Sequence, residues 1–159
     1  MKKLLLPITL LLVVMLTIAS CTKTEECTMC GTYDGNIKTN DTLRVHVGSA
    51  INLDTTFTTM TSKAVISEIA DIEDSLSLTV SLDLAGTSTD VTVTAFKSSD
   101  TKLVVTDAIY NYSGITDILV NGDVVVDGTK ATANVIISPA PSTPSSIVIS
   151  GNLTFIGNK

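Results

Sequence analysis

Residues 76–84 read Leu-Ser-Leu-Thr-Val-Ser-Leu-Asp-Leu, an unbroken alternation of apolar and polar side chains. Successive side chains of a β-strand point to opposite faces of the sheet. The stretch therefore places its leucines and its valine on one face and its polar residues on the other. A period of two indicates a strand that is buried on one side and solvated on the other, as in an antiparallel sheet.

The same alternation recurs on both sides of this stretch. Leu43, Val45 and Val47 alternate with Arg44 and His46. Further strand-like runs are expected at residues 91–94, 103–112, 115–126, 131–137 and 147–156. The links between these runs are too short for the crossovers that parallel strands need, so antiparallel pairing is expected.

Turn residues separate the runs. Asp127-Gly128 lies between two apolar stretches and predicts a hairpin. Asn121-Gly122 indicates either a second turn or a bulge within a long strand. Further turns are expected at Ala85-Gly86, at residues 98–100 and in the proline-rich loop 139–144.

One stretch departs from the period of two. Its apolar residues fall at helical spacing and consist of Val65, Ile69, Ile72 and Leu76. This stripe predicts a short helix at about 62–74. The alternative is a strand that ends in an acidic turn at Glu73-Asp74.

These elements predict an all-β domain at residues 31–159, either a single antiparallel β-barrel or a β-sandwich, with at most one short helix. Three segments, GTYDGNI (31–37), VNGDVVVDG (120–128) and ISGNLTFIGNK (149–159), resemble the edges of calycin-like and lipocalin-like small barrels. Such domains are common in bacterial surface lipoproteins. The resemblance implies a small barrel.

The first twenty residues have a different character. Lys2 and Lys3 precede an apolar run at 4–18, which is shorter than the roughly 20 residues of a membrane-spanning helix and fits a signal peptide better. Residues 18–21, Ile-Ala-Ser-Cys, resemble the lipobox of bacterial lipoproteins. The resemblance implies that residues 1–20 are removed and that Cys21 carries the lipid. The alternative is a transmembrane helix followed by an incidental thiol.

The residues after Cys21 bear on the destination. Thr22 replaces the aspartate that resembles an inner-membrane retention signal, and Lys23-Thr24-Glu25-Glu26 looks like the charged signals of surface-displayed lipoproteins. We therefore expect a lipidated tether at 21–30 and attachment to the outer membrane, with surface exposure as an open alternative.

The composition excludes some partners. The chain carries 16 acidic against 10 basic residues, and two of the basic residues leave with the signal peptide. An acidic surface argues against nucleic-acid binding. Tryptophan is absent and other aromatic residues are few, which argues against stacking platforms for bases or sugars.

Cys27 and Cys30 form a C-x-x-C pair with three interpretations. The first is a local disulfide or two free thiols in an exported segment. The second is a redox dithiol, although the expected strand-to-helix context is missing. The third is a metal site, for which His46 would supply a third ligand where a structural zinc site wants four. We assign no metal ligand and no cofactor.

No catalytic residue is assigned, and an enzyme is not expected. His46 is the only histidine, and no G-x-S-x-G nucleophile elbow accompanies it. The acidic cluster Asp71, Glu73 and Asp74 is explained by a turn or a helix end. The pair Tyr110 and Tyr112 lies near a strand end, where tyrosines serve either recognition or ordinary packing.

Two functions remain. The first is a non-catalytic module that binds a small apolar ligand or an envelope protein. The second is a structural or assembly component of the cell surface that pairs through strand edges. The inward side chains of residues 76–84 either fill the interior or line a ligand cavity, and this distinguishes the two.

Overall fold

The computed structural model describes residues 26–159 except 50, 71, 85–86 and 113–115. Its strands are β1 (Gly31–Thr39), β2 (Leu43–Val47), β3 (Ile51–Thr55), β4 (Met60–Glu68), β5 (Ser75–Leu84), β6 (Thr87–Ser99), β7 (Lys102–Tyr112), β8 (Thr116–Asp127), β9 (Lys130–Pro139) and β10 (Ile147–Asn158). The expected signal peptide, the lipidation site Cys21 and the Ala85-Gly86 turn lie outside the described residues.

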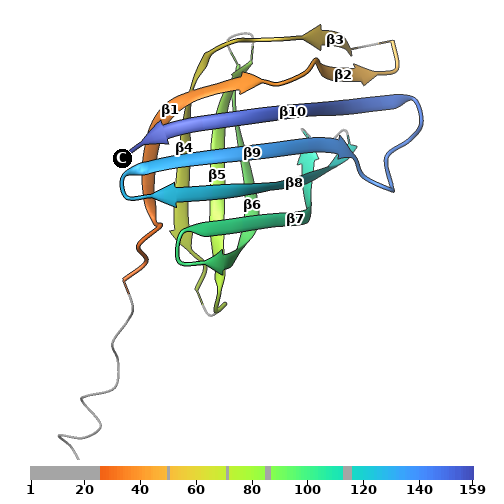
Figure 1. The fold of residues 1–159 in the computed structure, drawn as a ribbon. Coiled ribbons are helices and arrows are strands. Elements are labelled where there is room, and N and C mark those ends of the chain that lie inside the picture. The colour runs from red at the N-terminus through yellow and green to blue at the C-terminus, as the bar shows by residue number, and fades with distance from the viewer. Residues whose placement is uncertain (1–25, 50, 71, 85–86, 113–115) are drawn as a thin grey trace, which may run out of the picture.

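Eight of the strands close into an antiparallel barrel (Figure 1). The order runs from β1 through β4, β5, β6, β7, β8 and β9 to β10, and β10 pairs back onto β1 from Asp34↔Asn158 to Thr39↔Leu153. The first half of β10, Ile147–Ser150, pairs instead with β2, so the β2–β3 hairpin extends the sheet beyond the barrel. The all-β expectation is confirmed, and the barrel alternative is the correct one.

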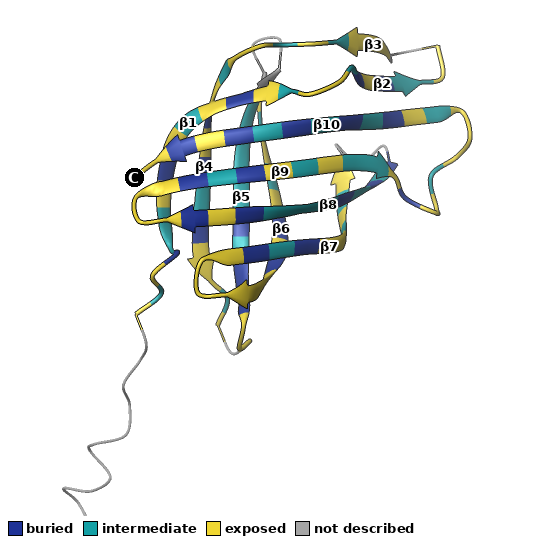
Figure 2. Cartoon of the chain, in the orientation of Figure 1, coloured by how far each residue is buried: buried dark blue, intermediate teal, exposed yellow. Residues whose placement is uncertain are grey.

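The alternation of the sequence produces the core. Buried and exposed residues alternate along the strands (Figure 2), and on β5 both Leu76 and Leu78 are 2% exposed. Tyr33 and Phe155 are the largest fully buried side chains. Small buried residues accompany them, namely Ala64, Ala95, Ala131 and Ala133. Large and small side chains therefore pack together in the barrel core.

The helix predicted at 62–74 is wrong, and the alternative of a strand with an acidic turn is correct. β4 occupies residues 60–68 and pairs with β1 on one edge and β5 on the other. Glu73 and Asp74 form the turn into β5, and Asp74 has a positive φ of 58°. Ser62, Ala64 and Ile66 are the buried residues of β4, so pairing on both edges and a period of two override the helical stripe.

The turn predicted at Asp127-Gly128 is confirmed, and of the two alternatives at Asn121-Gly122 the bulge within a long strand is the correct one. Asp127 pairs with Lys130 across the β8–β9 hairpin, and Gly128 adopts a φ of 60° in the turn. Asn121-Gly122 is not a turn, because both residues lie inside β8. A Cβ on Gly122 would lie 2.1 Å from the backbone oxygen of Asn134, so glycine is required there by close backbone approach.

The packed domain begins before Gly31. Cys27 and Cys30 form a disulfide around a turn in which the Cys30 N–H donates to the Cys27 carbonyl. Met29 is 2% exposed within the barrel core, and the buried Tyr33 hydroxyl donates to the Met29 carbonyl at 2.7 Å. The segment 27–30 therefore covers one end of the barrel, and we call it the plug. Residues 27–30, which the sequence assigns to a tether, therefore belong to the packed domain.

Candidate binding site

The interior of the barrel is tightly packed at the plug end and looser towards the other end. Along β5, Leu76 and Leu78 are buried, whereas Val80 and Leu82 are partly exposed. The same decrease in burial runs along β6 from Ala95 to Val91 and along β9 from Ala133 to Ile137. Inward-facing apolar side chains thus retain accessible surface away from the plug.

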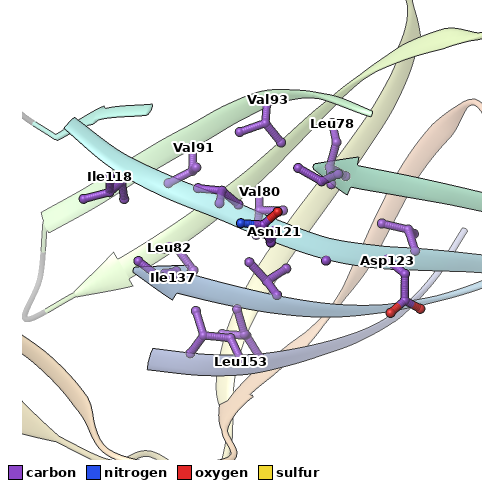
Figure 3. Close-up of a pocket in the computed structure, with 16 residues that line it drawn as sticks. Leu78, Val80, Leu82, Val91, Val93, Ile118, Asn121, Asp123, Ile137 and Leu153 are labelled. Atoms are coloured by element: carbon purple, nitrogen blue, oxygen red, sulfur yellow. The ribbon is translucent and has the colours of Figure 1, made fainter. Parts of the chain in front are cut away.

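A pocket occupies this looser part of the interior (Figure 3). Its volume is about 50 Å³, taken as the space open to the centre of a water-sized sphere. One water needs about 10–15 Å³ on this measure, so the pocket holds about four water-sized groups. Its side chains are mostly aliphatic and come from β1, β5, β6, β7, β8, β9 and β10, with Leu78, Val80, Leu82, Val91, Val93, Ile118, Ile137 and Leu153 among them.

The barrel wall beside the pocket is incompletely paired. β6 and β7 are connected by residue pairs only near their shared turn, from Phe96↔Val104 to Ser99↔Lys102. In the described chain, residues 87–95 of β6 pair with β5 alone, and residues 105–110 of β7 pair with β8 alone. We call these two facing, unpaired edges the β6–β7 seam. Figure 1 shows that β7 runs across the view from its turn with β6 and bends sharply upward near its end.

A β-bulge explains why β7 leaves its neighbour. The register of β7 against β8 shifts between Val105 and Ala108, and Asp107 adopts a φ of 48°. The Asn121 side-chain oxygen accepts the Asp107 N–H at 2.8 Å, which satisfies a backbone donor that the bulge removes from the ladder. The bulge bends β7 after it has paired with β6, and the seam begins there.

One side chain bridges the seam. The Tyr110 hydroxyl donates to the Asp90 carbonyl at 3.1 Å. In a regular ladder a backbone amide would make this bond, across strands about 4.8 Å apart. A tyrosine side chain is longer than a backbone amide, so it can make this bond where the two backbones are not paired. Tyr110 therefore acts as a latch between β6 and β7.

The seam and the pocket adjoin one another. Val91 and Val93 on β6 and Val105 on β7 line the pocket, and these strands also flank the seam. Within the seam the charged residues are Asp90 and Asp107, both acidic. The site thus combines two bare strand edges, an acidic rim and a small apolar pocket.

The other candidate residues lie elsewhere. Cys27 and Cys30 lie at the plug, where a carboxylate oxygen of Glu68 is within 4.8 Å of both sulfurs. The two sulfurs are bonded to each other at 2.03 Å. Because a structural zinc site uses thiolates, this cluster would become a ligand set only after reduction.

The histidine belongs to the β2–β3 hairpin. His46 Nε2 and Asp54 Oδ1 are 3.0 Å apart, and Arg44 Nε lies 3.9 Å from the same oxygen. All three side chains are partly or largely solvent-exposed. The acidic cluster expected near residue 72 is represented by Glu73 and Asp74, which are exposed in the β4–β5 turn. Neither group reaches the pocket.

Sequence reasoning placed the pocket's β5 side chains correctly on the inward face but missed the seam. The alternation at 103–112 predicts one regular strand, whereas the structure has a bulge at Asp107. The sequence signal for this bulge is Asn121-Gly122 on β8, which lies opposite the bulge on β7.

No helix in the described part of the chain has the length and apolar character needed to cross a bilayer. No protein family and no curated protein matches the chain. Among solved structures it is similar to a crystal structure described as a "putative outer membrane protein" from Bacteroides fragilis NCTC 9343, with 20% sequence identity and a TM-score of 0.46. The similarity covers 83% of this chain and 51% of the other, so this chain spans about half the length of that protein.

Proposed function

We propose that this protein is a lipoprotein of the outer membrane, anchored through Cys21, whose barrel is a non-catalytic binding module that accepts a small apolar group. The observation that carries the binding role is the apolar pocket beside an unpaired part of the barrel wall. Neither the pocket nor the unpaired strand edges add to the stability of the barrel, so a binding role explains them better.

The anchor is supported by the sequence around Cys21 and by the way the chain enters the barrel. The plug lies at the packed end, and Cys21 precedes Glu26 by five residues, which span at most about 17 Å. A lipid on Cys21 would therefore hold the plug end near the membrane. The looser end of the barrel, with its pocket, would face away from the bilayer.

The size of the pocket favours a ligand that inserts only a small apolar group. About four water-sized groups correspond to one branched aliphatic side chain or to the end of a hydrocarbon chain. A complete lipid needs several times this volume. The favoured ligand is therefore a molecule that inserts one apolar group and keeps the rest outside.

Dye binding tests the proposal directly. A lipid-free form starting at residue 21 with Cys21→Ser should bind a neutral fluorescent dye that carries a single isobutyl group, saturably and at one site. Val91→Trp, which fills the pocket, should weaken binding at least tenfold. Val148→Trp places the same side chain on a half-exposed position of β10 and serves as the matched control. Absence of dye binding, or equal loss in both variants, would contradict the proposal.

A second function is favoured by one observation. β3 ends the sheet order, and within the described residues its outer edge has no partner strand. A bare edge can pair with another chain, as a surface assembly component would require. The same lipid-free form should then oligomerise with rising concentration on size exclusion. Asn52→Pro on β3 should restore the monomer, and a monomer at all concentrations would remove this alternative.

A further inference from the structure

Several features of the molecule besides the pocket itself offer candidate chemistry. The exposed cluster of Arg44, His46 and Asp54 satisfies its own charges. The plug cysteines are joined to each other. Exposed apolar residues on the outer wall, such as Ile109 and Ile156, lie on different parts of the barrel and define no single surface. The β6–β7 seam is different, because its backbone, its charge and the pocket behind it all fit one kind of partner.

We propose that the seam binds an extended peptide segment, which adds as a β-strand between β6 and β7 and inserts one aliphatic side chain into the pocket. The inference rests on the proposed binding function and names its ligand class. In strand addition, main-chain hydrogen bonds supply affinity and pockets for alternate side chains supply specificity. The seam offers both parts of this arrangement.

The backbone is the first argument. Residues 87–95 and 105–110 present two facing edges that lack ladder partners on the seam side. Each edge carries N–H and C=O groups that alternate in direction along the strand. A peptide strand satisfies both rows at once. A hydrocarbon chain offers them no hydrogen bond.

The pocket is the second argument. A strand placed in the seam would point every second side chain inward, towards Val91, Val93 and Val105. The volume of about 50 Å³ suits one valine, leucine or isoleucine side chain. The pocket accepts one such side chain or the end of an acyl chain, so the unpaired strand edges, and not the pocket, favour a peptide over a lipid.

Charge is the third argument. Asp90 and Asp107 are the charged residues of the seam, and both are exposed. The rim therefore favours a peptide with lysine or arginine beside its apolar residues and disfavours an acidic one. Opening of the seam breaks the hydrogen bond from the Tyr110 hydroxyl. The Asp90 carbonyl that it now engages would accept a peptide N–H instead, so the latch competes with the incoming strand.

The experiment uses the mature lipoprotein purified from membranes and reconstituted in lipid nanodiscs, with empty nanodiscs as the blank. The probe is a fluorescein-labelled peptide of about seven residues that alternates valine and threonine and has lysine at both ends. Its matched control carries methyl groups on alternate backbone nitrogens, which prevents strand pairing and leaves the side chains unchanged. Fluorescence anisotropy should show saturable binding of the first peptide and at least tenfold weaker binding of the second.

Variants of the protein locate the binding. Val91→Trp should weaken the peptide at least tenfold and Asp90→Asn about two- to fivefold, whereas Asp34→Asn on β1 should have no effect. Tyr110→Phe removes the competing hydrogen bond and should tighten binding by up to about fivefold.

The outcomes separate this inference from the proposed function. Equal binding of the two peptides, or a loss caused by Asn52→Pro on β3 and not by Val91→Trp, would overturn strand addition at the seam. Dye binding without peptide binding would also overturn it and leave the apolar binding function standing. Failure of both dye and peptide would remove the proposed function itself.

Discussion

The plug makes a quantitative prediction that separates a structural segment from a tether. Met29→Ala removes three heavy atoms from a side chain that is 2% exposed in the barrel core. At about 0.8 kcal/mol for each buried methylene-sized group, the transfer free energy lost is about 2.4 kcal/mol. A residual cavity adds to this, while the position at the end of the barrel allows partial collapse. We therefore expect a loss of about 2–4 kcal/mol in the free energy of unfolding.

The assay is equilibrium unfolding in urea of the lipid-free form, followed by far-UV circular dichroism because the chain contains no tryptophan. The midpoint of thermal unfolding should fall by roughly 10 °C. Thr28→Ala is the matched control, since Thr28 is an exposed neighbour, and it should change stability by less than about 0.5 kcal/mol. If Met29→Ala behaves like Thr28→Ala, then the segment is a tether and the structural interpretation of the plug is refuted.

Three further predictions concern other parts of the chain. Gly122→Ala should destabilise the barrel by about 1–3 kcal/mol in the same urea assay, because its Cβ would meet the Asn134 backbone oxygen; an unchanged midpoint would contradict the close approach. Replacing both Cys27 and Cys30 by serine should cost about 1.5 kcal/mol, the chain entropy of so short a loop, and a loss above about 4 kcal/mol would show that the disulfide does more than close it. Cys21→Ala should move the protein from the membrane fraction to the soluble fraction of cells, and retention in the membrane would exclude the lipid anchor.

Much of the fold could be predicted because its decisive signal is local. The alternation at 76–84 needs no partner to be recognised, and the Asp127-Gly128 hairpin follows from turn chemistry alone. Closure into a barrel is different. It depends on the pairing of β10 with β1, whose residues are more than a hundred positions apart, and the alternation is the same in a sandwich.

The errors have physical causes of their own. The stripe through Val65 and Ile69 has helical spacing, yet this stretch pairs on both edges in the barrel, and such tertiary pairing is invisible in a single sequence. Met29 is one apolar residue between two cysteines, and the tertiary contacts that make its segment part of the core cannot be seen in a single sequence. The bulge at Asp107 gives no pattern on β7 itself, because its only sequence signal, Asn121-Gly122, lies on the partner strand β8.

The β6–β7 seam is the part of the structure on which the binding account depends, and amide hydrogen exchange measures it residue by residue. In the free protein, the amides of residues 88–95 that point away from β5 should exchange fast, because they lack a partner strand on that side. Amides of residues 76–80, which are paired on both edges of β5, should exchange slowly. Addition of the valine–threonine peptide should slow exchange in the seam and leave β5 unchanged. Slow exchange throughout β6 in the free protein, or no change on adding the peptide, would contradict the account.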